Sequence, residues 1–534
     1  MPTEAQVEAT PPSSAAPGPV SWRPVLFAWV LLSALTGAPY LRAWLAPPAG
    51  KTFQGVFYFD DDQYNYLSYV EQAERGAFLF ANKLVLEPHP RLIVNLEWWV
   101  VGRLSALLGG RPFLAYRLFW LAAAFALVLG VDRWLRAAGL PESHRLPALL
   151  LVGLGGGLGG LAWRAGLLPV MDAIDIRTGL FPFLEVLANP HFVAGTALLV
   201  WSLWALHRAA TPRDHAGATL LGTALGLVRP YDLFLLGGTR GLAVLLGEAP
   251  RNWPRRLAPL LGLVPAMGYL SWVFYAVPWF GSFGVTYAVP PLSSFLVALA
   301  PASMLAALPG KPTDPRTRTA RLHLASWIAV VLFVLLLRPV GFRLQFVAGL
   351  GVPLLALGAV GLARFPPPAT LLPALLLSTS SLVALQLVFA DDGDWYVTPE
   401  RLEVAAALRI SCHQGDLALT PPDIGLYVLG LTACRPYVSH AVAPFHAERD
   451  QAARRFFEAS PPAERAAFLE HLCITHLALP GDAGDAPEAW LGAGTPFRRI
   501  AVVGGEPRRI SLYARADRSA CAKGSSTPRP VSSP

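Results

Sequence analysis

Long apolar runs separated by short polar segments dominate the first 390 residues of this chain. A helix needs about 20 predominantly apolar residues to cross the hydrocarbon core of a bilayer. About eleven runs approach or reach that length, at Pro24–Leu45, Pro112–Val131, Leu146–Gly166, His191–Leu206, Gly217–Val228, Leu233–Leu246, Leu257–Val277, Leu292–Leu308, Leu322–Leu337, Leu344–Leu362 and Thr370–Ala390. The fifth and sixth are short, so we expect them to form a hairpin that enters only the outer leaflet. The pattern predicts an α-helical polytopic membrane domain over residues 24–390.

The composition of the 534 residues excludes most soluble classes. Only 15% are charged and 54% are hydrophobic, whereas soluble domains carry roughly 25% charged residues. The net charge of +8 comes mostly from Arg between apolar runs, which is typical of a membrane protein and does not indicate a nucleic-acid-binding face. We therefore expect the lipid bilayer as a partner and no nucleic acid. The glycine-rich residues 153–160 lie inside an apolar run and favour close helix packing over nucleotide binding.

Lys and Arg gather in alternate short loops, which by the positive-inside rule puts the N-terminus in the cytoplasm. Residues 1–23, rich in Pro, Ala and Ser, are expected to be a disordered cytoplasmic tail followed by a signal anchor. A cleaved signal peptide is the competing interpretation. With an odd number of spans, everything after residue 391 lies outside, as in a multi-pass protein of a bacterial-type inner (plasma) membrane.

The C-terminal segment has a different pattern. Strand-like stretches lie at residues 416–420, 436–439, 474–479, 499–503 and 509–514, and helix-like stretches lie at residues 423–429, 448–458 and 464–472. This pattern predicts a small periplasmic α/β domain over residues 391–515 and a disordered tail over residues 516–534. All four cysteines lie in this part of the chain: Cys412, Cys434, Cys473 and Cys521. An oxidising compartment permits a disulfide, and Cys412–Cys434 is the first pair to test, with free buried thiols as the alternative.

Candidate chemistry lies in the first outer loop, residues 47–111. Asp60, Asp61 and Asp62 are consecutive, and their mutual repulsion should raise the pKa of at least one of them. The following residues predict a helix with Asp62 as its N-cap and Tyr66 on an aromatic face. A solvated acidic turn is the alternative to a catalytic or metal-holding carboxylate beside an aromatic platform for a sugar.

An amphipathic segment, Leu92–Leu108, follows the turn Pro88–Arg91. Its charges disfavour a membrane span, so we expect it to lie on the outer interface. There the side chains of Trp98 and Trp99 would sit at the level of the lipid headgroups.

The order of these motifs resembles the GT-C superfamily of polyprenyl-phosphate-dependent membrane glycosyltransferases. The likeness is strongest to the branch containing family 39, with the protein O-mannosyltransferases and the lipid A aminoarabinose transferases. Family 39 usually has Asp-Glu where this chain has Asp62-Gln63, and a double-proline turn with Lys where it has Pro88-His89-Pro90-Arg91. The motifs that carry the resemblance are Asp62 with Tyr66, Gly76, Pro88–Arg91, Arg117, residues 226–231 and residues 341–346.

The resemblance implies an inverting transfer of a sugar from a polyprenyl-phosphate donor to a hydroxyl of a glycan, lipid or protein acceptor. Asp62 matches the catalytic carboxylate of the family best and Asp61 is the alternate, with the role of general base. The remaining candidate substrate-binding residues are Tyr66, His89, Arg91, His191, Arg229 and Arg343.

Two of these candidates, Arg229 and Arg343, are expected at outer helix ends, where a guanidinium fork suits phosphate oxygens. Snorkelling to the interface is the alternative for both. His191 could donate to phosphate or sugar, or simply cap a helix. Divalent cations such as Mg²⁺ or Mn²⁺ prefer carboxylate oxygens, so Asp60 and Asp175 are candidate ligands for a metal that the reaction does not require.

Three other functions remain open. A lipid-linked-sugar transporter or flippase should show internal repeats and ionisable residues in mid-span, and we find no repeat. A polysaccharide polymerase or ligase usually has its large outer loop late in the chain. The Asp62-Gln63 departure also leaves open an inactive scaffold with the GT-C fold.

Overall fold

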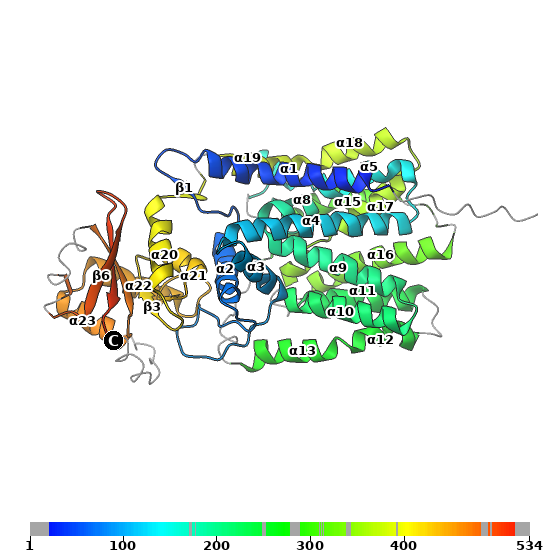
Figure 1. Cartoon of the computed structure of the whole chain (residues 1–534). Coiled ribbons are helices and arrows are strands. Elements are labelled where there is room, and N and C mark those ends of the chain that lie inside the picture. Colours follow the sequence, from blue (N-terminus) through cyan, green and yellow to red (C-terminus); the bar gives the residue numbers. More distant parts are fainter. Residues whose placement is uncertain are drawn as a thin grey trace, which may run out of the picture.

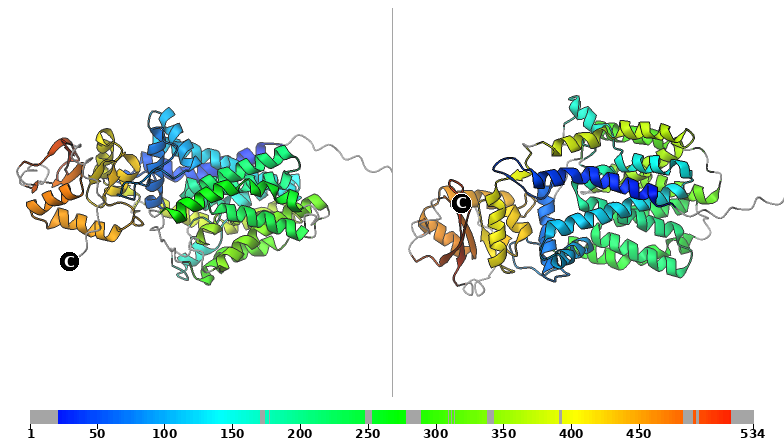
Figure 2. Two further views of the ribbon diagram at one scale, coloured as in Figure 1. Left: turned by 90° about the horizontal axis from the view of Figure 1, so that it is seen from below. Right: turned by 45° about the horizontal axis from the view of Figure 1, so that its top comes forward.

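The computed structural model describes residues 21–169, 174–176, 178–247, 253–277, 289–308, 310, 312, 314–337, 343–390, 393–481, 490–491 and 494–517. A bundle of roughly parallel helices forms one end of the molecule and an α/β unit forms the other (Figure 1). Two helices of the first outer loop, α2 (Asp60–Glu74) and α3 (Leu96–Leu107), lie between them. Figure 2 shows the same order of parts from two further directions.

Helices of the bundle correspond to the apolar runs of the sequence. Their bounds are α1 Arg23–Leu45, α4 Pro112–Ala137, α5 Arg145–Leu154, α6 Gly159–Arg164, α8 Pro182–Ala188, α9 Pro190–Arg208, α10 Pro212–Val228, α11 Asp232–Gly247, α12 Trp253–Leu261, α13 Val264–Ser271, α15 Leu292–Ala306, α16 Pro315–Leu336, α17 Gly351–Leu362, α18 Pro367–Leu377 and α19 Thr379–Val388. Short turns of helix occupy Glu142–His144 and Arg343–Val347, and a π-helical turn, Trp272–Ala276, extends α13. The expectation of a mostly helical membrane protein is confirmed.

Fewer helices are long and apolar enough to span a membrane than the sequence pattern predicts. Within the described ranges, four helices are long and apolar enough to cross a membrane, or six if each bent pair counts as one span. The bent pairs are α12 with α13 (44°) and α18 with α19 (46°). The run Leu146–Gly166 is also broken, because residues 155–158 separate α5 from α6. The count of eleven is therefore not confirmed, since continuous apolar character does not locate such breaks.

One expected detail at the start of α2 is wrong. Asp62 is not the N-cap, because the helix begins two residues earlier and its N-cap is Phe59 in a left-handed conformation (φ 55°). All three aspartates therefore lie within the first turn, where the free N–H groups and the helix dipole favour negative charge.

A five-stranded sheet organises the C-terminal unit, with strand order β4-β3-β5-β7-β6. The first three strands are parallel and the last two pairings are antiparallel. The elements are β3 Leu417–Leu419, β4 Arg435–Pro436, β5 His476–Pro480, β6 Phe497–Val503, β7 Ile510–Arg515, α20 Pro399–Ser411, α21 Gly425–Leu431, α22 His446–Glu458 and α23 Pro462–His471. The sequence pattern located each strand and all helices but α20.

Several contacts join the first outer loop to this unit. Strand β1 (Thr52–Phe53) pairs with β2 (Tyr396–Val397), and α2 packs along α21. The Cys412–Cys434 disulfide, the pair favoured by the sequence, links the end of α20 to the strand that follows α21. The expected tails lie mostly outside the described residues.

Candidate active site

The acidic turn of α2 is partly buried at the junction between the helical bundle and the C-terminal unit. Burial, followed by repulsion from Asp61, raises the pKa of Asp60. This agrees with the expectation that three consecutive carboxylates perturb one another. The turn thus concentrates negative charge where a proton or a cation is readily accepted.

A histidine from the C-terminal unit contacts this turn. His440 Nε2 lies 3.2 Å from Asp62 Oδ1, and the His440 side chain is only 5% exposed. The backbone N–H of Val442 donates to His440 Nδ1 at 3.0 Å. In the neutral ring the proton must then be on Nε2, so that His440 donates a hydrogen bond to Asp62. Sequence reasoning missed His440, because nothing in the residues around it distinguishes it from other histidines.

Gln63 anchors the same turn to the bundle. Its Nε2 donates to the carbonyl oxygens of Tyr58 at 2.5 Å and Ala188 at 3.2 Å. The ring of Phe59 meets that of Phe192 edge to face, with centroids 5.8 Å apart. Gln63 stands where family 39 usually has Glu, and here its amide provides a donor that a carboxylate would lack.

The aromatic face of α2 lies against the start of α9. Tyr66 stacks on Trp98, with centroids 4.7 Å apart, and the His191 ring lies 5.1 Å from Tyr66. Glu97 Oε2 lies 2.7 Å from His191 Nδ1. Two candidate residues from distant parts of the sequence, Tyr66 and His191, are therefore neighbours. Trp98 is buried in this cluster, so its ring packs against protein side chains.

Arg229 is the C-cap of α10, so it lies at a helix end as the sequence predicts, but its side chain is buried inside the protein. Its guanidinium pairs with Asp232 at 3.1 Å and donates to Thr196 Oγ1 at 3.2 Å. Space for it comes from Gly195, where a Cβ would lie 1.8 Å from Arg229 Cδ. Glu185, which accepts from Thr196 at 2.8 Å, completes this buried polar group. In this arrangement Asp232 already pairs with the Arg229 guanidinium, the cation that a phosphate would need as its partner.

His89 and Arg91 line a cleft of about 510 Å³ between the first outer loop and the C-terminal unit. His89 Nε2 accepts from the backbone N–H of Asn82 at 3.0 Å, and burial lowers the His89 pKa. This cleft is lined by residues of the second half of α2, well along the helix from the acidic turn.

The candidate metal ligands are not brought together in any group that the structure describes. Asp175 Oδ2 accepts from the backbone N–H of Gly157 at 3.1 Å, so the carboxylate fills the break between α5 and α6. Within the described ranges, one group of three side chains has metal-ligand spacing, Cys412 with Cys434 and His476, and its two sulfurs form the disulfide. The side chain of Arg343 lies outside the described residues.

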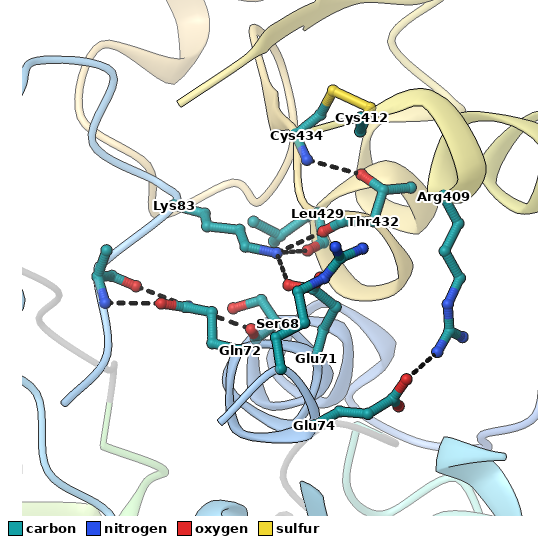
Figure 3. Close-up of polar contacts among 12 residues, drawn as sticks. Ser68, Glu71, Gln72, Glu74, Lys83, Arg409, Cys412, Leu429, Thr432 and Cys434 are labelled. Carbon is teal, nitrogen blue, oxygen red and sulfur yellow. Dashed lines mark hydrogen bonds and ion pairs between the residues drawn. A yellow bond between two sulfur atoms is a disulfide. The ribbon is translucent and has the colours of Figure 1, made fainter. Parts of the chain in front are cut away.

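Ion pairs hold the second half of α2 against the C-terminal unit (Figure 3). Lys83 Nζ lies 2.9 Å from Glu71 Oε2 and donates to the carbonyl oxygens of Thr432 at 2.5 Å and Leu429 at 3.4 Å. Arg409 pairs with Glu74 at 2.5 Å. These contacts fix the distance between the acidic turn and the residues that approach it from the C-terminal unit.

Comparison with solved structures shows that the chain has the fold of GT-C glycosyltransferases, whereas no family model and no curated protein matches the sequence. The arabinofuranosyltransferase AftD from Mycobacteria superposes with a TM-score of 0.56 at 17% identity, over 93% of this chain and 40% of that chain. This chain thus spans about two fifths of AftD. ArnT from Cupriavidus metallidurans bound to undecaprenyl phosphate gives 0.51 at 14% identity, over 93% and 99%. The oligosaccharyltransferase of Archaeoglobus fulgidus gives 0.50 at 11% identity, over 93% and 74%.

Proposed function

We propose that this chain is a membrane glycosyltransferase that moves a sugar from a polyprenyl-phosphate donor to an acceptor hydroxyl at the outer face of the inner membrane. The GT-C fold supports the reaction class, and the undecaprenyl phosphate held by ArnT supports the type of donor. The acceptor would be a glycan, a lipid or a protein.

The observation that carries the proposal is the contact between Asp62 and His440 in the first turn of α2. His440 contacts Oδ1 of Asp62, and we propose that Oδ2 of Asp62 accepts the proton of the acceptor hydroxyl. As the oxygen of the acceptor hydroxyl attacks the anomeric carbon of the donor sugar, the bond from this carbon to the phosphate oxygen breaks, and the polyprenyl phosphate leaves with the electron pair. Asp62 takes the acceptor proton, which makes it the general base of a single inverting displacement.

The departing phosphate requires positive charge or hydrogen-bond donors. We assign this to His191 and Arg343, whereas Arg229 would contribute only if Asp232 released it, and Arg91 lies with His89 at the cleft, on the acceptor side. Tyr66, which stacks on the buried Trp98, supplies the aromatic surface beside His191 on which a sugar would lie. A divalent cation at Asp60 or Asp175 is compatible with this chemistry and is not needed for it.

The proposed topology follows from the charges in the loops. The N-terminus is cytoplasmic, residues 24–390 form the membrane domain and residues 391–515 form an extracytoplasmic domain. This orientation places the acidic turn and His440 on the same side of the membrane as a donor sugar that faces outward.

The experiment that tests the proposal compares wild type with Asp62→Asn and Asp61→Asn. Purified protein receives a polyprenyl-phosphate sugar, and release of polyprenyl phosphate is measured. Loss of a general base should lower the rate by roughly 10²–10⁴-fold in Asp62→Asn. Asp450→Asn, which removes a partly exposed carboxylate of α22, is the matched control and should keep full activity.

Two results would contradict this assignment. Full activity in both Asp62→Asn and Asp61→Asn would remove the acidic turn as the source of the base. A wild-type protein that releases no polyprenyl phosphate from a range of donors, but moves the lipid-linked sugar across a bilayer, would favour the transporter alternative.

A further inference from the structure

The cleft of about 510 Å³ has two walls that come from different parts of the chain. Its volume is within the range of small-molecule sites. One wall is the second half of α2 with the loop after it, and the other is the C-terminal unit.

The charge of this lining is strongly positive. Its four cations are Arg75, Lys83, Arg91 and Arg435, against one carboxylate, that of Glu71. Glu71 is already shared, because it pairs with both Lys83 and Arg75. The remaining positive charge is not balanced by any carboxylate among the described lining residues, and this charge favours an anionic occupant.

Arg435 carries a second indication of a ligand. Its Nη1 donates to the carbonyl oxygen of Leu86 at 2.6 Å and its Nη2 to that of Gly415 at 3.3 Å. Its Nε is buried and has no hydrogen-bond partner within the part of the chain that the structure describes. A half-buried guanidinium that donates to neutral carbonyls and keeps a buried, unpartnered Nε is best satisfied by an oxyanion, which accepts hydrogen bonds and neutralises the charge.

The lining also argues against a lipid chain. The described residues that face the cleft include no large aliphatic side chain and no Phe, Tyr or Trp. The apolar surface comes from Ala and Pro side chains and from the stems of the long charged ones, so an isoprenoid chain would lie among cations, and a neutral sugar would find no ring on which to stack. A hydrophilic group with a carboxylate or phosphate fits this lining better than either.

The position of the cleft relates it to the acidic turn. Nine residues of α2 separate Asp62 from Glu71, which corresponds to about 14 Å along the helix. On the other side, the chain of the C-terminal unit passes from Arg435 at the cleft to His440 at Asp62. An extended oligosaccharide can therefore occupy both places at once, whereas a single sugar cannot.

We propose that the cleft is a binding subsite for an anionic group of a glycan acceptor, remote from the hydroxyl that Asp62 deprotonates. This inference rests on the proposed function and names the class of acceptor: an oligosaccharide that carries a carboxylate or phosphate. The ion pairs of Lys83 and the disulfide next to Thr432 keep the two walls of the cleft in register.

The test measures binding of an oligogalacturonide, a carboxylate-bearing probe, and of a neutral oligosaccharide of equal length to purified full-length protein. The variant is Arg75→Gln/Arg91→Gln, which removes two cations and leaves the Lys83–Glu71 pair intact. Wild type should bind the anionic probe in a salt-sensitive manner, and the variant should bind it at least tenfold more weakly. Arg454→Gln, which removes an exposed cation of α22, is the control and should bind as wild type does.

Arg435→Gln is a second variant, because it removes the half-buried cation that the first variant retains, and its binding of the anionic probe should fall by a similar factor. Equal binding of the anionic probe by wild type and both variants would overturn the inference. Weaker binding of undecaprenyl phosphate in these variants, with oligogalacturonide binding unchanged, would assign the cleft to the donor and overturn it too. Because binding is measured without turnover, failure of the cleft is distinguishable from failure of the transfer reaction.

Discussion

Asp62 and His440 are 378 residues apart in the chain, and their contact brings two separately encoded features into one site. The acidic triplet is visible in the sequence because three consecutive carboxylates are costly unless a partner is present. The histidine is not visible, because its importance comes from a hydrogen bond to Val442 that fixes its tautomer. Local chemistry can therefore identify the charged half of this site, whereas the fold supplies the half that orients it.

We predict that His440→Ala lowers kcat about tenfold with little change in KM, because it removes a donor to a charged carboxylate. His440→Gln should restore most of the rate, since its Nε2 can donate to Asp62 from a similar position. Transfer kinetics of both variants check this. Equal losses in the two variants would show that His440 acts only through packing.

Other parts of the site likewise combine residues that the sequence identifies with residues that only the fold brings to them. Tyr66 and His191 were recognised as candidates, and the structure places their rings 5.1 Å apart. Glu97 contacts His191 through its carboxylate, but in the sequence it is only one charge of an amphipathic segment. The burial of Arg229 depends on the missing side chain of Gly195, and no periodicity indicates that these two residues meet.

At the scale of elements, α2 connects the helical bundle to the C-terminal unit. Its first turn contacts the bundle through Gln63, and its second half contacts the C-terminal unit through Glu71. Burial raises the pKa of Glu71, but the pairs with Lys83 and Arg75 outweigh burial and bring it below its ordinary value of 4.5. The charged form of Glu71 is therefore stabilised by folding.

Glu71→Gln should destabilise the protein by about 3 kcal/mol at neutral pH, because it leaves the buried Lys83 without its carboxylate. For a carboxyl with a lowered pKa, the stabilisation is present above 4.5 and is lost as the pH falls through the lowered value. The difference in unfolding temperature between wild type and variant should accordingly shrink on acidification. Glu464→Gln, which breaks an exposed pair with Arg455, is the control and should change stability little.

If the variant and wild type unfold at the same temperature at pH 7, the pair does not stabilise the junction between α2 and the C-terminal unit.

The strands and all but one helix of that unit were predictable, because their apolar positions alternate with period 2 or recur with helical period. Helix α20 was missed, although Pro399 and Glu400 at its start are typical of a helix N-terminus.

At the scale of the whole molecule, hydropathy alone predicts a helical membrane protein with a separate C-terminal unit, because long apolar runs have few other stable arrangements. The breaks in the helices are not predictable in this way. The break between α5 and α6 exists because Gly157 offers an N–H to the buried carboxylate of Asp175, a contact between segments 18 residues apart. Hydropathy averaged over a window contains no information on such a contact.

The cleft also depends on contacts between distant segments that the sequence pattern does not reveal. Its cations are dispersed over residues 75–91 and residue 435, and none of these stretches has a charge density that marks an anion site on its own. The packing of α21 against α2 creates the site. A sequence pattern identifies the fold of this molecule more readily than the surfaces that its parts form together.

A structure of the full-length protein in complex with undecaprenyl phosphate is the most direct test of the central claim, that the first turn of α2 is the catalytic centre. We predict that the phosphate lies beside Asp62, within reach of His191, and that the isoprenoid chain lies along the helical bundle. A phosphate bound away from the Asp60–Asp62 turn would contradict the account.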